Sequence, residues 1–147
     1  MKDCQNCGLC QTRKNVVIGK GSKHPKVLFI GEAPGRDEDE KGIPFVGASG
    51  ELLDKWIAFL GLNKEECAFV NAVKCFPHNG DFIPRKPTQE EMAACSPLLA
   101  KQIADLKPQL IFLLGKTALE SFIPHKGILK SSGQYLENKG IKYFCMV

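Results

Sequence analysis

Short apolar runs alternate with polar loops and helical segments along this chain. Val27–Ile30 and Leu110–Leu114 are compact apolar runs that are each followed by a glycine, and Cys67–Val73 is a similar run. Runs of this length, bounded by turn-forming residues, are typical of strands buried on both faces. The run Ile141–Val147 predicts a fourth strand.

Three segments have the spacing of helices. Glu51–Leu60 carries its apolar residues at positions that share one helical face. Thr88 and Glu91 form the capping-box pattern that opens a helix, which we expect to run to about Leu106. Lys116–Phe122 predicts a short third helix. The apolar face expected in the first of these helices consists of Leu52, Leu53, Trp56, Ile57 and Leu60.

The order strand, loop, helix recurs about three times along the chain. It predicts an α/β domain, a three-layer sandwich with a mainly parallel central sheet. Residues 32–50 and Phe76–Pro87 are predicted to be loops. Ligands of such sheets bind beyond the carboxyl ends of the strands. Because residues 31–50, 71–87 and Gly115 follow these ends, we expect the functional site among them.

Composition narrows the class of protein. The 147 residues, 44% of them hydrophobic, suit a single domain with one core that spans residues 1–147. A net charge of +4 permits a polyanionic partner without demanding one. The polar first residues argue against a signal peptide, and no apolar run approaches the roughly 20 residues of a membrane span. Seven cysteines without a secretory segment indicate a reducing compartment, the cytoplasm.

Four cysteines have a spacing that suits a metal site. Cys4 and Cys7 form a Cys-x2-Cys pair, and Cys75 and Cys95 could complete a set of four thiolates. Such a site would join the N-terminus to the middle of the fold. Spacing alone leaves zinc and an iron–sulfur cluster both open. Cys10 is expected to be a spectator, because the ferredoxin-type continuation is absent after it.

Other candidate residues have ordinary explanations. Cys67 and Cys145 lie in strand-like runs and are expected to be buried thiols. His78 is expected to be a loop residue rather than a catalyst. Several basic residues are candidate phosphate contacts, although each one alone fits a solvated surface position: Lys20, Lys23, Lys26, Arg85, Lys86, Lys126 and Lys130.

The loop after the first strand is rich in glycine, proline and acidic residues. It lacks the Gly-Lys-Ser/Thr ending of a phosphate loop and the Gly-x-Gly-x-x-Gly of a dinucleotide site. Its carboxylates are better suited to water or a cation than to phosphate. Phe45, flanked by Pro44 and Gly47, either stacks on a flat ligand ring or packs into the core.

Several motifs taken together resemble one enzyme family. The segment Gly31-Glu-Ala-Pro-Gly, followed by Glu38-Asp39 and Gly42-x-Pro-Phe-Val-Gly, is similar to the first active-site motif of family 4 uracil-DNA glycosylases, the iron–sulfur type. Further landmarks of that family are similar to three other segments, and the resemblance covers nearly the whole chain in the same order. These segments are Cys4-x2-Cys-x-Leu, Asn71-Ala-Val-Lys-Cys and Ala94-Cys-x-Pro.

The resemblance implies roles for individual residues. Phe45 matches the aromatic that stacks on the flipped uracil, and Asn71 matches the amide that reads the base edge. Gly31 lets the backbone approach the ligand closely. Glu32 and Glu38 match acidic positions near the attacked sugar carbon and are the expected catalytic residues. The implied [4Fe–4S] cluster, with zinc as the alternative metal, would be bound by Cys4, Cys7, Cys75 and Cys95.

The implied fold is that of uracil-DNA glycosylases. The implied activity is hydrolysis of the bond between uracil and deoxyribose in base excision repair. The implied partner is uracil-containing DNA, and we expect a monomer with no membrane association.

One landmark of the family is absent from these residues. The family carries a His-Pro-x-x-Leu type motif after a late strand, and none of His24, His78 and His125 lies in that context. Ile141–Val147 is the strand that would lead into it, so we expect a chain truncated before its second catalytic motif. Two alternatives follow: a truncated, inactive iron–sulfur protein that binds nucleic acid or uracil, and a zinc-stabilised α/β binding protein.

Overall fold

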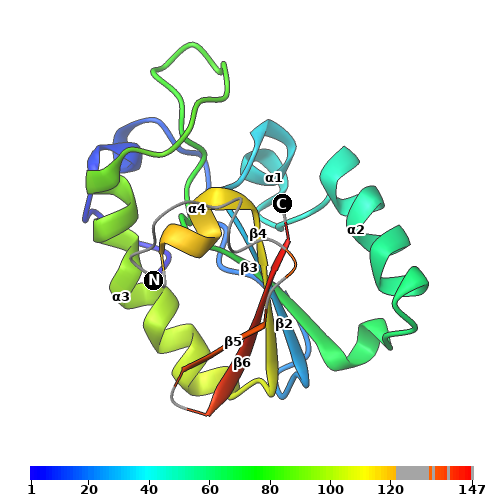
Figure 1. Cartoon of the computed structure of the whole chain (residues 1–147). Coiled ribbons are helices and arrows are strands. Elements are labelled where there is room, and N and C mark those ends of the chain that lie inside the picture. The colour runs from blue at the N-terminus through cyan, green and yellow to red at the C-terminus, as the bar shows by residue number, and fades with distance from the viewer. Residues whose placement is uncertain (122–132, 134, 139, 147) are drawn as a thin grey trace.

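A six-stranded sheet forms the centre of the molecule (Figure 1). The computed structural model describes residues 1–121, 133, 135–138 and 140–146. In the strand order β1-β3-β2-β4-β6-β5 the central strands are parallel, and both edge strands are antiparallel to their neighbours. The strands are β1 (Lys20–Gly21), β2 (Val27–Gly31), β3 (Cys67–Asn71), β4 (Leu110–Leu114), β5 (Tyr135–Asn138) and β6 (Ile141–Met146).

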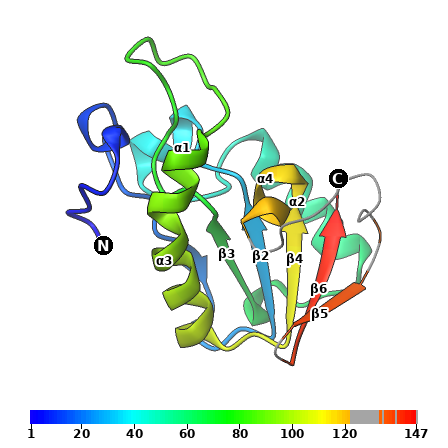
Figure 2. The ribbon, with the colours of Figure 1, turned by 60° about the vertical axis from the view of Figure 1, so that its left-hand side comes forward.

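Helices cover both faces of the sheet and complete the three layers (Figure 2). The long helix α3 (Gln89–Leu106) and α4 (Gly115–Glu120) pack on one face, and α2 (Ala48–Phe59) packs on the other. The predicted α/β sandwich is thus confirmed. The shorter helical segments are α1 (Arg36–Lys41), η1 (Gly8–Gln11) and η2 (Lys64–Glu66). Across the described part of the chain, no helix has the length and hydropathy that a bilayer span requires.

Two apolar clusters lie on the two faces of the sheet. The cluster towards α3 and α4 is mainly aliphatic and includes Ile30 and Leu99. The cluster towards α2 is aromatic: the Phe29 ring stacks with Phe69 and with Phe112, at centroid distances of 5.5 and 5.0 Å. The central strands contribute to both clusters, so burial on both faces explains why their sequences are continuously apolar.

The predicted strands are present, with small shifts at their ends. β3 ends at Asn71, two residues before the predicted end, and β6 is described as far as Met146. Val147 and Phe122, the predicted ends of the last strand and of the last helix, lie outside the described residues. The edge strand β1 was not predicted, because its two residues are too few to show an alternating pattern.

The prediction that residues 32–50 are entirely loop is wrong, because Arg36–Lys41 form helix α1. This hexapeptide has no apolar periodicity, and a contact from elsewhere in the chain anchors it. The Asp39 carboxylate accepts backbone N–H groups of Lys14, at 3.0 and 3.1 Å, and of Asn15, at 3.0 Å. A helix stabilised in this way leaves little trace in its own sequence.

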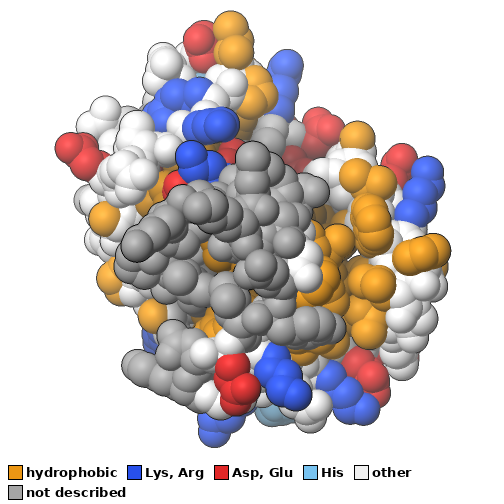
Figure 3. Space-filling view, viewed as in Figure 1, with side chains coloured by type: hydrophobic (Ala, Val, Ile, Leu, Met, Phe, Trp, Pro, Cys, Tyr) orange, Lys and Arg blue, Asp and Glu red, His pale blue; other side chains and the backbone are white. Residues whose placement is uncertain are grey.

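The apolar face predicted on α2 is only partly turned towards the sheet. Leu53 and Ile57 are buried against the sheet, whereas Leu52, Trp56 and Leu60 are 58%, 42% and 41% exposed. The helix also begins at Ala48, three residues earlier than expected. Figure 3 shows hydrophobic side chains gathered on the surface over this helix. The apolar residues of α2 are therefore divided between the core and a surface beside the sheet.

Candidate active site and cysteine cluster

A pocket of about 410 Å³ opens at the carboxyl edge of the central sheet. The last residues of β2 and β3, Gly31 and Asn71, are paired in register and both line it. Glu32 and Phe45 line it as well, so four of the five predicted substrate-binding and catalytic residues lie together. This is the location expected for a ligand site in a parallel sheet.

Gly31 lies between the two residues predicted to contact the base. A Cβ atom on Gly31 would lie 2.6 Å from Asn71 Oδ1 and 2.7 Å from Phe45 Cζ. Both distances are too short for any real side chain, so only glycine lets the aromatic ring and the amide come this close. The backbone of β2 therefore forms the floor of the pocket.

Asn71 has a side chain available for a ligand. The residue is 3% exposed, and its amide makes no hydrogen bond to any other described residue. The side chain lines the pocket, so its amide can bond a partner that enters there. The backbone carbonyl of Asn71, in contrast, accepts a hydrogen bond from Lys74 Nζ.

Phe45 both lines the pocket and packs against the protein. Its ring meets the edge of Phe69 at a centroid distance of 6.2 Å, and the side chain is half-buried. Packing against the core is thus observed, and the pocket-lining position of the ring keeps stacking on a ligand as a prediction.

The two candidate catalytic carboxylates have different surroundings. Glu32 lines the pocket and accepts a hydrogen bond from the Thr117 hydroxyl at the start of α4. Glu38 is buried in the first turn of α1, where its carboxylate accepts the Gly35 N–H at 3.0 Å. Glu38 is not among the residues that line the pocket.

Several further residues of this site were not predicted from the sequence. Thr117 holds the Glu32 carboxylate, although the two residues are 85 positions apart in the chain. Trp56 of α2 and Met146 of β6 contribute apolar walls. The sequence places Trp56 on the apolar face of a predicted helix, whereas no sequence signal points to Thr117 or Met146.

The four cysteines predicted as ligands lie in one region near the N-terminus. Cys75 and Cys95 are buried with Leu9 in an apolar cluster, against which Cys7 packs. The charges of Cys4 and Cys7 both act on Cys95. Among the described residues, no three potential ligands are close enough to hold a single metal ion. The structure thus brings the four thiols to one region without forming a single-ion site.

Burial raises the pKa of the Cys75 thiol to about 12 and also raises the pKa of Cys95. The Arg13 guanidinium, which lies 3.8 Å from Cys75 Sγ, partly opposes the shift at Cys75. A metal must displace the protons of these thiols, so binding would be coupled to proton release. Soft thiolates in an apolar, partly shielded region are a suitable donor set for iron–sulfur or zinc.

A fully buried lysine connects the pocket to the cysteines. Lys74 follows β3 and is 0% exposed. Burial lowers its pKa to about 8, and the charge of Cys95 partly opposes this shift. Its ammonium donates to the Asn71 carbonyl, while its backbone N–H bonds Cys95. The pocket and the cysteine cluster therefore share one short stretch of chain.

His78 organises the loop that follows. Its Nδ1 accepts the N–H groups of Gly80, at 3.1 Å, and Phe82, at 3.3 Å, while Nε2 lies 3.3 Å from the Thr12 carbonyl. These contacts suit a ring in which Nδ1 accepts and Nε2 donates. The ring also stacks on Phe82, at a centroid distance of 5.1 Å. His78 is thus the loop residue that the sequence suggested.

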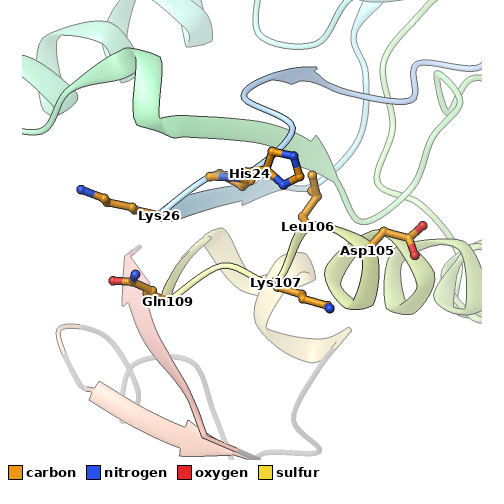
Figure 4. A pocket seen from close by; sticks show the side chains of 7 residues that line it. His24, Lys26, Asp105, Leu106, Lys107 and Gln109 are labelled. Atoms are coloured by element: carbon orange, nitrogen blue, oxygen red, sulfur yellow. The ribbon is translucent and has the colours of Figure 1, made fainter.

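A second cavity, of about 420 Å³, lies at the opposite edge of the sheet (Figure 4). His24, Lys26 and Asp105 are among the residues that line it, and the Lys26 and Asp105 side chains point in opposite directions. Lys26 pairs with Glu66 and Asp105 with Lys101. Lys26 and Asp105 are thus paired with other residues and do not converge on a ligand position.

The fold agrees with the family that comparisons to known proteins identify. The sequence profile described as the Uracil DNA glycosylase superfamily matches residues 18–146. The chain therefore belongs to the uracil DNA glycosylase superfamily.

Its curated relatives include several type-4 uracil-DNA glycosylases. The protein of Archaeoglobus fulgidus is 43% identical over 117 residues, which are 80% of this chain and 57% of the relative. The protein of Saccharolobus solfataricus is 44% identical, with coverages of 79% and 52%. The protein of Pyrobaculum aerophilum is 41% identical, with coverages of 95% and 66%. These similarities confirm the family 4 resemblance, and the chain spans about half to two thirds of the length of these relatives.

Proposed function

We propose that this protein is a uracil-DNA glycosylase, which hydrolyses the bond between uracil and deoxyribose in DNA and leaves an abasic site. The observation that carries this proposal is the pocket in which Gly31, Glu32, Phe45 and Asn71 come together. Enzymes that act on a base in DNA take it out of the stack into such a pocket. A volume of about 410 Å³ is within the range of small-molecule sites.

Asn71 is the proposed reader of the base. Its amide can donate to uracil O4 and accept from N3–H at the same time, and cytosine inverts both demands. Leaving buried groups unpaired would cost ~1–3 kcal/mol each, which is enough to discriminate between the two bases. The absence of a competing partner for this amide among the described residues supports the assignment.

Phe45 and the two glutamates have proposed roles around the reacting bond. Phe45 would stack on the flat uracil ring. Glu32 would position water or stabilise the positive charge that develops on the sugar, since it lines the pocket. Glu38 has a proposed role in shaping the same loop, because its carboxylate caps α1. Of the two, Glu32 is thus the better placed for catalysis.

Cys4, Cys7, Cys75 and Cys95 are the proposed ligands of a [4Fe–4S] cluster. When bound, the cluster would supply cross-linking rather than chemistry, because the reaction transfers no electrons. Zinc remains the runner-up metal. Thiolates suit either metal, and the resemblance to family 4 uracil-DNA glycosylases favours the cluster. Metal analysis separates the two, because only the cluster gives a brown protein that absorbs in the violet.

The remaining parts of the proposal follow from this activity. The partner is uracil-containing DNA, and residues 1–147 are proposed to belong to one domain that acts as a monomer. A reducing cytoplasm is the proposed location, because free thiols persist there.

Release of uracil from an oligonucleotide with one uracil tests the proposal. The iron-loaded 147-residue protein should release uracil, and Asn71→Ala should not. Cleavage by the wild type that persists unchanged in the variant would mean that Asn71 is not the reader. No cleavage by a folded, iron-bearing wild type would overturn the proposed activity.

A second candidate is a base-binding module without hydrolysis. It is favoured by one observation: none of the described residues that line the pocket is a histidine. Losing a preorganised donor at the leaving base typically costs ~100–1,000-fold in rate. Binding of free uracil without release from DNA would select this candidate.

A further inference from the structure

Lys20 lies beside the pocket on the edge strand β1, directly opposite Phe69 of β3. The sequence makes this lysine a candidate phosphate contact, with a solvated surface position as the alternative. Its ammonium instead donates a hydrogen bond to the Phe45 backbone carbonyl at 3.0 Å and lies 5.6 Å from the centre of the Phe69 ring. Phe69 is also the ring that Phe45 contacts edge-on. Lys20 therefore contacts both the backbone of Phe45 and the surface on which its ring rests.

Phe45 needs such support because its backbone is strained. Its φ angle is +54°, in the left-handed region that bulky residues rarely adopt. Strained residues of this kind persist only where the surroundings fix them, and they gather at functional sites. Removing one of the fixing contacts should let Phe45 relax towards an ordinary conformation and move its ring.

Only a few contacts fix this conformation. A Cβ atom on Gly50 would lie 2.0 Å from the Phe45 carbonyl oxygen, so α2 closely abuts that peptide. Among the described residues, Lys20 is the one whose side chain hydrogen-bonds to residues 43–47. The ammonium is thus the polar component of an otherwise steric clamp.

The position of Lys20 suits this role. Burial lowers its pKa, and the positive charge of Lys64 adds to the effect, while Asp54 and Glu38 oppose it. Within the described part of the chain Lys20 forms no ion pair, so the Phe45 carbonyl is its fixed polar partner. An ionised donor makes a stronger hydrogen bond than a neutral one.

We propose that Lys20 is a positioning residue of the base pocket, which holds Phe45 in its strained conformation so that the ring stays in place to stack on the base. The stacking role of Phe45 in this inference rests on the proposed function. The contact between Lys20 and Phe45 is independent of it.

Binding of free uracil to the iron-loaded protein tests the inference. Trp56 is the single tryptophan of the chain and lines the same pocket, so its fluorescence can report binding. Lys20→Met, which keeps the aliphatic stem, should weaken uracil binding roughly tenfold, the worth of one charge-assisted hydrogen bond. Lys20→Arg should retain most of the affinity. Lys23→Met, an exposed control that loses the same charge, should bind as the wild type does.

A double-mutant cycle with Phe45→Ala shows whether Lys20 acts through Phe45. In that background Lys20→Met should have no further effect on uracil affinity. A full tenfold effect there would overturn the proposal, as would wild-type affinity in Lys20→Met alone. A Lys20→Met protein that fails to fold would also overturn it, because Lys20 would then serve the fold rather than the pocket.

Backbone chemical shifts of Phe45 give a readout that needs no ligand. In Lys20→Met they should move away from the values of a left-handed residue, and in Lys23→Met they should not. If the wild type binds no uracil, the proposed function fails, yet these shifts still decide whether Lys20 positions Phe45. Unchanged shifts in Lys20→Met would overturn the inference.

Discussion

The base pocket and the cysteine cluster are held by different means, although both begin at the end of β3. The pocket is formed at strand ends whose register is fixed by the sheet, with Gly31 opposite Asn71. The cysteine cluster joins the N-terminal segment to the loop after β3 and to α3, through an apolar contact around Leu9. Strand register fixes the first region, whereas few regular backbone contacts fix the second.

This difference indicates where each region derives its stability. The pocket should keep its shape without any bound group, because its floor is the central sheet. In the cysteine region, burial raises the pKa of the Cys75 and Cys95 thiols, which must lose their protons to bind a metal. The stability of this region should therefore depend on whether a metal is bound. The following tests are ordered from the largest expected effect to the smallest.

Replacing Cys75 by alanine should have the largest effect. Cys75→Ala should lose bound iron and solubility together, because one of the four proposed ligands is removed from a buried site. Iron content and violet absorption measure the first effect, and the yield of soluble protein measures the second. Cys10→Ala is the matched control and should keep both. Full iron content in Cys75→Ala would contradict the assignment of ligands.

Substitutions of the two glutamates should affect different quantities, the rate of uracil release for one and the stability of the fold for the other. Glu32→Gln should slow uracil release by about 100-fold, as expected for a catalytic carboxylate, with little change in melting temperature. Glu38→Gln should instead lower the free energy of unfolding by ~1 kcal/mol, because it weakens the cap of α1. Single-turnover rates and thermal unfolding measure the two quantities. The reverse pattern would assign catalysis to Glu38.

Filling the floor of the pocket should weaken uracil binding with the cysteine region intact. Gly31→Ala adds a methyl group that collides with Asn71 and Phe45, and the resulting overpacking should cost roughly tenfold or more in affinity. Isothermal titration with uracil measures this loss, and the iron content should not change. Gly8→Ala is the control, since a Cβ there meets nothing within 4 Å. If Gly31→Ala binds uracil as tightly as the wild type does, the pocket can adjust to the added methyl group more easily than its contacts indicate.

A substitution at the start of α3 should have the smallest effect, and its effect on the free energy of unfolding should depend on pH. Hydrogen bonds from Arg85, at 2.7 and 2.9 Å, hold the pKa of Glu91 below its ordinary value of 4.5. Its contribution to stability is therefore complete above pH 4.5 and is lost as the pH falls through the lowered pKa. At pH 7, Glu91→Gln should lower the free energy of unfolding by ~1–2 kcal/mol.

Urea unfolding of the iron-free protein at neutral and acidic pH measures this difference, which should vanish in acid. Glu90→Gln changes the exposed neighbour in the same helical turn and should show no such dependence. A difference that persists in acid would mean that the cap acts by packing rather than by charge. The result shows whether the start of the helix that carries Cys95 is stable without a bound group.

The regular part of the fold could be predicted because its sequence signals are local. Strands β2, β3 and β4 are continuously apolar since they are buried on both faces, and Thr88 with Glu91 marks the start of α3. The location of the site at strand ends followed from the parallel sheet.

The remainder depends on contacts between distant segments. α1 rests on hydrogen bonds from Lys14 and Asn15 to Asp39, and Glu32 is held by Thr117. Neither contact can be read from nearby residues. Helical periodicity shows which residues of α2 are on its apolar face. It does not show which of them pack into the core and which line the pocket, because this helix borders both.

The path of the N-terminal segment has a consequence for protein synthesis. Its backbone joins the strand-end loop where the Val17 N–H meets the Lys74 carbonyl at 2.7 Å. Cys75 follows Cys7 by 68 residues, so at ~5–20 residues per second the two leading thiols leave the ribosome seconds before their partners. During that interval they are open to oxidants. Translation speed and the redox state of the cell should therefore influence the fraction of this protein that acquires its proposed metal centre.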